Sequence, residues 1–176
     1  MNIFDTPQWK VLQPFFKERD FLDGEEEGLV IRCRRNRFKA WCGYVGVPEG
    51  HSLFGKGYSE RVPVPSRGSL KIKDQSPIAL MIEAMHEDDG CVSLDVFLDA
   101  PGGITYSGKN WPAADGLWYF GFDCSHYNDL SPQDIIMSFG DYPFDIELDG
   151  ERTYKDLVFV ETATRKLAQQ IAGVFK

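Results

Sequence analysis

Apolar side chains repeat along the chain with spacings that predict both helices and strands. The most regular stretch lies at the C-terminal end, where apolar residues recur every three or four positions from Leu157 to Val174. This spacing places them on one face of a helix. Thr153 and Asp156 have the spacing of a capping box, with Asp in place of Glu, which predicts that Thr153 caps this helix. We expect the apolar face to pack across a sheet, and a homodimer interface is the alternative.

The strands of that sheet are predicted from shorter patterns. A strand is expected to begin at Leu29 and to continue, through a hairpin turn at residues 35–37, into a second strand over residues 38–47. Residues 23–28 are rich in acids and glycine and predict a turn before the first of these strands. Residues 117–122 are apolar on both faces, which is typical of a covered strand near the centre of a sheet.

The remaining elements complete a predicted α+β fold. Residues 91–98 predict a strand, and residues 104–107 are expected to pair with it. Short helices are predicted after Thr6-Pro7 and Ser76-Pro77, because a hydroxyl residue before proline is a common helix start. We therefore predict a single domain over residues 1–176, with a mainly antiparallel sheet of hairpins packed by the C-terminal helix and one or two short helices.

Composition narrows the classes of function. The chain has 176 residues, of which 43% are hydrophobic, enough for a sizeable core. Its formal net charge of -8 argues against direct nucleic-acid binding, which requires a basic surface. It has no apolar run long enough to span a bilayer and no signal-peptide pattern. Its four cysteines form no CxxC pair. These features predict a cytoplasmic protein with reduced thiols.

The loop after the apolar strand holds the most reactive side chains. Asp123, Cys124, His126 and Asp129 lie within seven positions, and loops at strand ends keep side chains both rigid and accessible. Three interpretations are open. Cys124 could be a nucleophile paired with a histidine, the three other residues could hold a divalent ion together with His51, or all could be structural. No catalytic, metal or cofactor motif has its required spacing, so a non-enzymatic protein without metal or cofactor is favoured.

Two glycine-rich segments could join this loop in a binding surface. Residues 46–68 form a long connection rich in Gly and Pro, a kind of segment that is often functional. The turn after Pro101 lacks the spacing of a phosphate-binding loop but could bring an aromatic residue close to a ligand. The predicted binding residues are His51, Lys56, Tyr58, Gly102, Gly103, Tyr106, Asp123, His126 and Asp129.

An acidic stretch provides a second candidate surface. Residues 129–161 contain nine acids against two bases, a local charge of -7. A solvated face is the simpler interpretation, and a patch that binds a basic protein partner is the other.

Three motifs in a fixed order resemble a family of small proteins from tailed phages and prophages. They are Cys42-Gly-Tyr-Val-Gly-Val-Pro-Glu-Gly-His51, Gly102-Gly-Ile-Thr-Tyr-Ser-Gly108, and Trp118-Tyr-Phe-Gly-Phe-Asp-Cys-Ser-His126 followed by Asp129. Chains of that family end in a helix that begins near Thr-Tyr-x-x-Leu, which matches residues 153–157 here, and the resemblance covers residues 29–172. The chain departs from the family at Pro101, where the family has a histidine. A function that needs this histidine would be lost or performed differently.

The resemblance implies a phage or prophage accessory protein that acts inside a bacterial cell by binding. Its partner would be a host defence protein that it inhibits, or a small nucleotide-like signal that it sequesters. The alternative function is that of a small hydrolase, either metal-assisted or of the Cys/His type.

Overall fold

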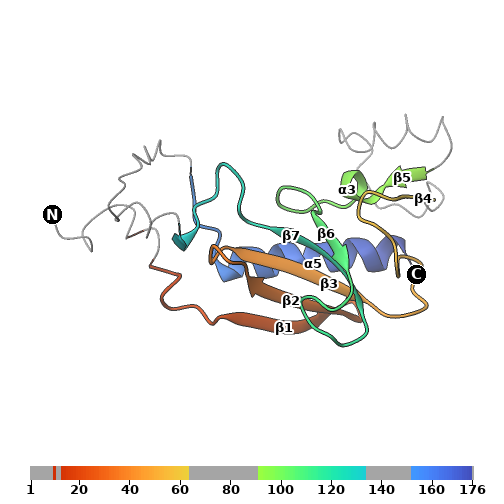
Figure 1. Cartoon of the computed structure of the whole chain (residues 1–176), viewed down its shortest axis with the longest axis horizontal. Helices are drawn as coiled ribbons and strands as arrows, with labels where there is room; N and C mark the ends of the chain where they lie inside the picture. The colour runs from red at the N-terminus through yellow and green to blue at the C-terminus, as the bar shows by residue number, and fades with distance from the viewer. Residues whose placement is uncertain (1–9, 11–12, 64–90, 134–151, 176) are drawn as a thin grey trace.

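A five-stranded antiparallel sheet, with a long helix across one face, forms the body of the molecule (Figure 1). The computed structural model describes residue 10 and residues 13–63, 91–133 and 152–175. The strand order is β1-β2-β3-β7-β6, and β4 and β5 form a separate two-stranded sheet. The elements are β1 (Phe21–Glu26), β2 (Leu29–Arg35), β3 (Trp41–Val47), β4 (Arg61–Pro63), β5 (Cys91–Ser93), α3 (Leu94–Phe97), β6 (Tyr106–Gly108), β7 (Trp118–Asp123) and α5 (Leu157–Val174). The α+β prediction is confirmed.

Helix α5 packs its apolar face on the sheet, as the sequence pattern predicts. Its buried residues are Leu157, Val160, Thr164, Leu167, Ala168 and Ile171. The helix lies against β1, β2 and β3. Close approach depends on Gly43 in β3, because a Cβ atom there would overlap Oγ1 of Thr164 and lie 2.6 Å from the ring of Phe122.

The start of α5 differs from the prediction. Asp156, and not Thr153, is the N-cap, and its side chain accepts a hydrogen bond of 2.8 Å from the backbone N–H of Phe159. Thr153 instead forms an isolated β-bridge with Asp129. The backbone of Thr153 is therefore already used before the helix begins.

Residues 21–26 form a strand, so the prediction of an acidic turn over residues 23–28 was wrong. Only Glu27 and Gly28 make the turn, and both have positive φ angles, of 52° and 78°. A two-residue turn with this geometry is the common connection of a β-hairpin. The acids of β1 are tolerated in the strand because basic side chains meet them, as where Arg32 and Arg34 contact Asp23 at 2.9 and 2.6 Å.

The β2–β3 hairpin is confirmed, with a longer turn than predicted. The side-chain oxygen of Asn36 accepts hydrogen bonds from the backbone N–H groups of Phe38 and Ala40, at 2.9 and 3.1 Å. These bonds hold residues 36–40 in a turn, so the second strand begins at Trp41 and not at Phe38.

Two predicted strands were wrong in their extent or pairing. The strand that begins at Cys91 ends at Ser93, because the N–H groups of Leu94 and Asp95 donate to the carbonyl oxygens of Glu60 and Tyr58. Helix α3 follows. Residues 104–107 do not pair with residues 91–98: β6 pairs with β7, and β5 pairs with β4.

Strand β7 lies between β3 and β6 and is buried over four of its six residues, as expected for a covered strand. The predicted helices after Thr6-Pro7 and Ser76-Pro77 lie outside the described residues, as does most of the acidic stretch. In the part of the chain that the structure describes, no helix has both the length and the apolar character needed to cross a membrane.

The face of the sheet opposite α5 carries an aromatic cluster of Tyr44, Tyr106, Trp111 and Tyr119. The loop between β6 and β7 crosses this face in front of β3 and β2 (Figure 1). It is held there by hydrogen bonds, since Nε1 of Trp111 donates to the hydroxyl of Tyr44 at 3.0 Å. Both faces of the sheet are therefore packed, with α5 on one and this loop on the other.

Glu18 connects the sheet to the start of α5. Its Oε2 atom accepts hydrogen bonds from Arg35, Trp41 and Tyr154 at 2.7 to 3.0 Å, and its Oε1 atom accepts one of 2.8 Å from the N–H of Leu157. The side chains of Glu18 and Arg35 are only 11% and 7% exposed, so this is a largely buried ion pair.

Candidate functional site

The loop after β7 meets the glycine turn at residues 101–103, as the sequence predicts. A Cβ atom at Gly102 would overlap Cε1 and Nε2 of His126 and lie 2.7 Å from Cδ2. The imidazole of His126 therefore rests on the backbone of Gly102. Gly102 and Gly103 have φ angles of 70° and 84°, a conformation that glycine adopts without strain. The turn shape and the absence of a side chain both make room for the ring.

Asp129 fixes the orientation of His126. Its Oδ2 atom lies 3.1 Å from Nδ1 of the imidazole and accepts a second hydrogen bond, also of 3.1 Å, from the backbone N–H of His126. Because a carboxylate only accepts, Nδ1 carries a hydrogen, and Nε2 is an acceptor in the neutral imidazole and a donor in the protonated one. Lys155 lies 3.8 Å from the other carboxylate oxygen. The Asp129 side chain is 8% exposed, whereas that of His126 is 37% exposed and can meet a ligand.

Asp123 supports the loop from the end of β7. It accepts hydrogen bonds from the N–H of Ser125 at 3.0 Å and from the hydroxyl of Thr105 at 3.3 Å. The amide of Asn36 donates to the hydroxyl oxygen of Ser125 at 2.8 Å. The β2–β3 turn is thus joined to the loop of His126, and Asp123 acts as a support for the loop.

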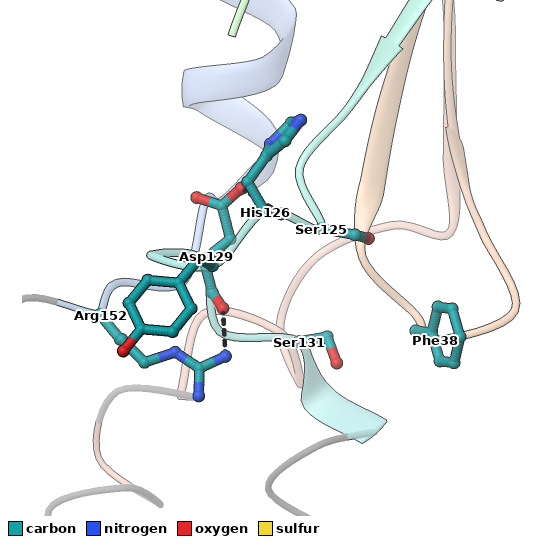
Figure 2. A pocket seen from close by; sticks show the side chains of 7 residues that line it. Phe38, Ser125, His126, Asp129, Ser131 and Arg152 are labelled. Carbon is teal, nitrogen blue, oxygen red and sulfur yellow. Dashed lines mark hydrogen bonds and ion pairs between the residues drawn. The ribbon is translucent and has the colours of Figure 1, made fainter. Parts of the chain in front are cut away.

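These loops line an open pocket of about 290 Å³. Figure 2 shows the side chains around it: Ser125 and Ser131 lie between Asp129 and Phe38, and Arg152 lies next to Asp129, on the side away from Phe38. The described residues that line it are Phe38, Ser125, His126, Tyr127, Asp129, Ser131 and Arg152. Phe38 and Tyr127 are exposed aromatic rings, at 38% and 85%. The pocket therefore combines hydroxyl and charged groups with exposed aromatic surface.

Arg152 enters the pocket from the chain just before α5. Its Nη2 atom donates to the carbonyl oxygen of Asp129 at 2.9 Å, a bond drawn in Figure 2. Its Nε atom is buried and has no hydrogen-bond partner among the residues that the structure describes. Arg152 also places a positive charge in the pocket of a protein whose net charge is -8.

The other predicted residues do not join this pocket. His51 lies near the end of α5, where its ring meets the backbone of Phe175, and burial lowers the pKa of its imidazole. The pocket lies at the start of α5, beside Arg152 and Lys155. The 18 residues of α5 span about 27 Å, so His51 and His126 cannot contact one ligand of small size.

Lys56 and Tyr58 lie near the start of β7, away from Asp123 at its other end. The carbonyl of Lys56 accepts a hydrogen bond from Nε1 of Trp118 at 2.9 Å, and the N–H of Tyr58 donates to the hydroxyl of Ser107 at 3.0 Å. Lys56 is also paired with Glu60 at 2.7 Å. Lys56 and Tyr58 therefore hold the loop between β3 and β4 against the sheet.

Tyr106 lies on the face opposite α5. Its ring packs edge-on against Tyr44 at 5.7 Å, and its hydroxyl donates to the carbonyl of Trp111 at 3.2 Å. The single surface predicted from the sequence is therefore divided. Gly102, Asp123, His126 and Asp129 come together, and His51, Lys56, Tyr58 and Tyr106 lie elsewhere.

The two hydrolase interpretations receive little support from the geometry. Cys124 is 2% exposed, and burial raises the pKa of its thiol, which keeps it protonated and unreactive. Among residues 13–63, 91–133 and 152–175, no three His, Cys, Asp or Glu side chains converge as metal ligands. Asp123 and Asp129 instead accept hydrogen bonds, from Ser125 and Thr105 and from His126 respectively.

Ser125 and Tyr127 of the pocket lie in the loop singled out from the sequence, although neither was predicted as a binding residue. Phe38, Ser131 and Arg152 were not predicted at all. They come from the β2–β3 turn, from the chain after Leu130 and from the approach to α5, so no local motif joins them. The bridge between Asp129 and Thr153 brings Arg152 to the loop, and its pairing could not be read from spacing.

Comparison with known proteins gives no match. The chain matches no family model, no curated protein sequence and no solved structure.

Proposed function

We propose that this chain is a binding protein whose pocket at His126 takes a small anionic ligand with a flat ring, of the size of a mononucleotide. One observation carries the proposal: hydroxyl groups, an arginine and exposed aromatic rings converge on one cavity beside an oriented histidine. Ligand sites commonly combine apolar or aromatic walls with a few well-placed polar groups.

The size of the cavity limits the ligand. Pockets that bury small ligands usually measure about 300–1,000 Å³, and this one, at about 290 Å³, is at the lower end. A cavity of this size suits one ring with a sugar and a phosphate.

The chemistry of the lining indicates how such a ligand would lie. Arg152 and the hydroxyl of Ser125 are suited to phosphate oxygens, because a guanidinium and a hydroxyl group donate hydrogen bonds to anions. Tyr127 and Phe38 offer ring faces for stacking. Arg37 lies 4.6 Å above the ring of Phe38 and adds a positive charge at the rim.

The resemblance to phage proteins provides a biological setting for this proposal. In a bacterial cell, a protein with such a pocket would sequester a nucleotide-like signal that host defence uses. Inhibition of a host defence protein by direct contact is the other form of the same binding function. Neither form requires turnover of the ligand.

A hydrolase is the second candidate, and the hydrogen bond between His126 and Asp129 favours it. A carboxylate that accepts from Nδ1 leaves Nε2 able to take a proton, which is the arrangement of a general base. Nε2 would take a proton from water as the water oxygen bonds to phosphorus, and that proton would pass to the alcohol oxygen that leaves the phosphate ester.

Isothermal titration calorimetry with adenosine monophosphate tests the proposal, with adenosine and ribose 5-phosphate as partial ligands. We expect saturable binding of the nucleotide, weaker binding of both partial ligands, and loss of affinity in Arg152→Gln and Tyr127→Ala. Lys166→Gln is the matched control, since Lys166 is an exposed base on α5 outside the pocket lining. Recovery of intact nucleotide supports a binding protein, whereas cleavage supports the hydrolase. No binding of any of the three probes would refute the proposal.

A further inference from the structure

Strand β1 is one edge of the five-stranded sheet, and it is longer than the strand at the other edge. β1 has six residues, against three in β6, and its only strand partner among the described residues is β2. Figure 1 shows β1 along the outer border of the sheet. An edge of this length is long enough to pair with a strand from another molecule.

The hairpin geometry determines which backbone groups face outward. In a two-residue hairpin, the residues that flank the turn, here Glu26 and Leu29, form a hydrogen-bonded pair, and every second pair along the ladder does the same. Leu22, Gly24 and Glu26 therefore bond to β2. The N–H and C=O groups of Phe21, Asp23 and Glu25 point away from it.

A contact from α5 agrees with this assignment. Nη1 of Arg165 donates to the carbonyl of Glu25 at 3.1 Å, which requires that carbonyl to face away from β2. Among the described residues, no backbone hydrogen bond engages the N–H groups of Phe21, Asp23 and Glu25. Three donors and two carbonyls are thus available along the outer edge.

The charges beside this edge select the kind of partner. Residues 20–27 contain five acids and no base. Asp23 is paired with Arg32 and Arg34, and Glu26 with Arg165. Asp20, Glu25 and Glu27 form no ion pair with any residue in the described part of the chain. In a two-fold pairing of β1 with β1 of a second copy, these acids would face each other, and like charges across strands are destabilising.

We propose that the outer edge of β1 binds an extended basic segment of a partner protein by adding it as a sixth strand. A lysine or arginine side chain of the partner would lie beside Glu25, and an apolar residue would lie beside Phe21, which is 59% exposed. The backbone ladder supplies the pairing, and the acids exclude a second copy of this chain. This proposal does not depend on a ligand in the His126 pocket.

Residue-resolved hydrogen exchange tests the proposal with a defined probe, a seven-residue peptide of alternating lysine and valine. In the free protein, we expect the N–H groups of Leu22, Gly24 and Glu26 to exchange slowly and those of Phe21, Asp23 and Glu25 to exchange fast. The peptide should slow the exchange of Phe21, Asp23 and Glu25 by at least about tenfold. Fast and slow exchange would then no longer alternate along β1. The effect should fade as the ionic strength is raised.

A control peptide and two variants at Glu25 separate the contribution of charge from that of backbone pairing. A peptide with glutamate in place of lysine should give no protection. Glu25→Thr removes the charge and keeps the N–H, so binding should weaken, whereas Glu25→Pro also removes the outward N–H and should abolish it. Equal protection by both peptides, protection without any peptide through self-association, or no protection by the lysine peptide would each overturn the proposal. Because exchange is read in the unmodified protein, the test stands even if Glu25→Pro does not fold.

Discussion

Gly102 and His126 are in contact so close that no side chain fits at residue 102. The ring of His126 occupies the place where a Cβ atom would lie. The neighbouring Gly103 has a similar positive φ angle, yet nothing lies within 4 Å of its Cβ position. The two glycines share a backbone conformation and differ only in what surrounds them.

This difference gives a matched pair of variants. Gly103→Ala should cost about 1 kcal/mol, from the left-handed backbone alone. Gly102→Ala should cost about 1–3 kcal/mol more, because the new methyl group displaces the imidazole. It should also weaken nucleotide binding at the pocket, as measured by denaturant unfolding and calorimetry. Equal effects of the two substitutions would show that His126 does not rest on Gly102.

A second prediction concerns the packing of α5 on β3. Gly43→Ala should lower the free energy of unfolding by about 1–3 kcal/mol, because its Cβ atom would overlap Thr164 and crowd Phe122. Gly173→Ala, in the last turn of the same helix, meets nothing within 4 Å and should stabilise the protein by up to about 1 kcal/mol. Urea unfolding measures both. A neutral Gly43→Ala would contradict the close approach of helix and sheet.

A third prediction tests the start of α5. Asp156→Ala should cost about 1 kcal/mol, because the hydrogen bond to the N–H of Phe159 is lost. Thr153→Ala should change stability by less than about 0.5 kcal/mol, since its bridge to Asp129 uses backbone groups. Thermal unfolding of the two variants compares them directly. A larger loss in Thr153→Ala would restore the capping box predicted from the sequence.

The fourth prediction follows from Glu18. Burial raises the pKa of its carboxyl, but hydrogen bonds from Tyr154, Leu157, Trp41 and Arg35 outweigh this effect, and the net pKa lies below the usual 4.5. A carboxyl with a lowered pKa in the folded state stabilises the protein above its unfolded pKa. That contribution is lost as the pH falls below about 4.5 and through the folded value.

Glu18→Gln should therefore cost about 3 kcal/mol at pH 7, because it leaves Arg35 buried without its charged partner. At acid pH, where Glu18 is protonated in the unchanged protein, the stability of the Glu18→Gln variant should approach that of the unchanged protein. Glu60→Gln is the control, since its pair with Lys56 is exposed and should contribute about 1 kcal/mol or less. Chemical unfolding between pH 3 and pH 7 measures the two curves. Parallel curves for Glu18→Gln and the unchanged protein would contradict the assigned role.

The sequence predicted the elements whose patterns are local. The stripe from Leu157 to Ile171 identified α5, and the apolar run of β7 identified a covered strand, because burial of one or both faces determines which side chains appear. Strand β1 was missed because its acids disfavour a strand until Arg32, Arg34 and Arg165 neutralise them. Those partners come from other elements.

Only the part of the candidate site that lies in one stretch of sequence was predicted. The loop of Asp123, His126 and Asp129 follows directly from the end of β7, and its meeting with Gly102 was expected. The separation of His51 from that loop depends on the length of α5, and the arrival of Arg152 depends on the Asp129–Thr153 bridge. Neither relationship has a signature in residue spacing.

The most direct test of the binding proposal observes the histidine side chains while adenosine monophosphate is added. The chain has three histidines, so their imidazole signals in a carbon–proton correlation spectrum can be assigned by single substitutions. We predict that the His126 signal shifts with a saturable curve while the His51 signal, near the far end of α5, stays in place. A His126 signal that does not respond to millimolar nucleotide, or a shift at His51 in its place, would contradict the assignment of the pocket as the ligand site.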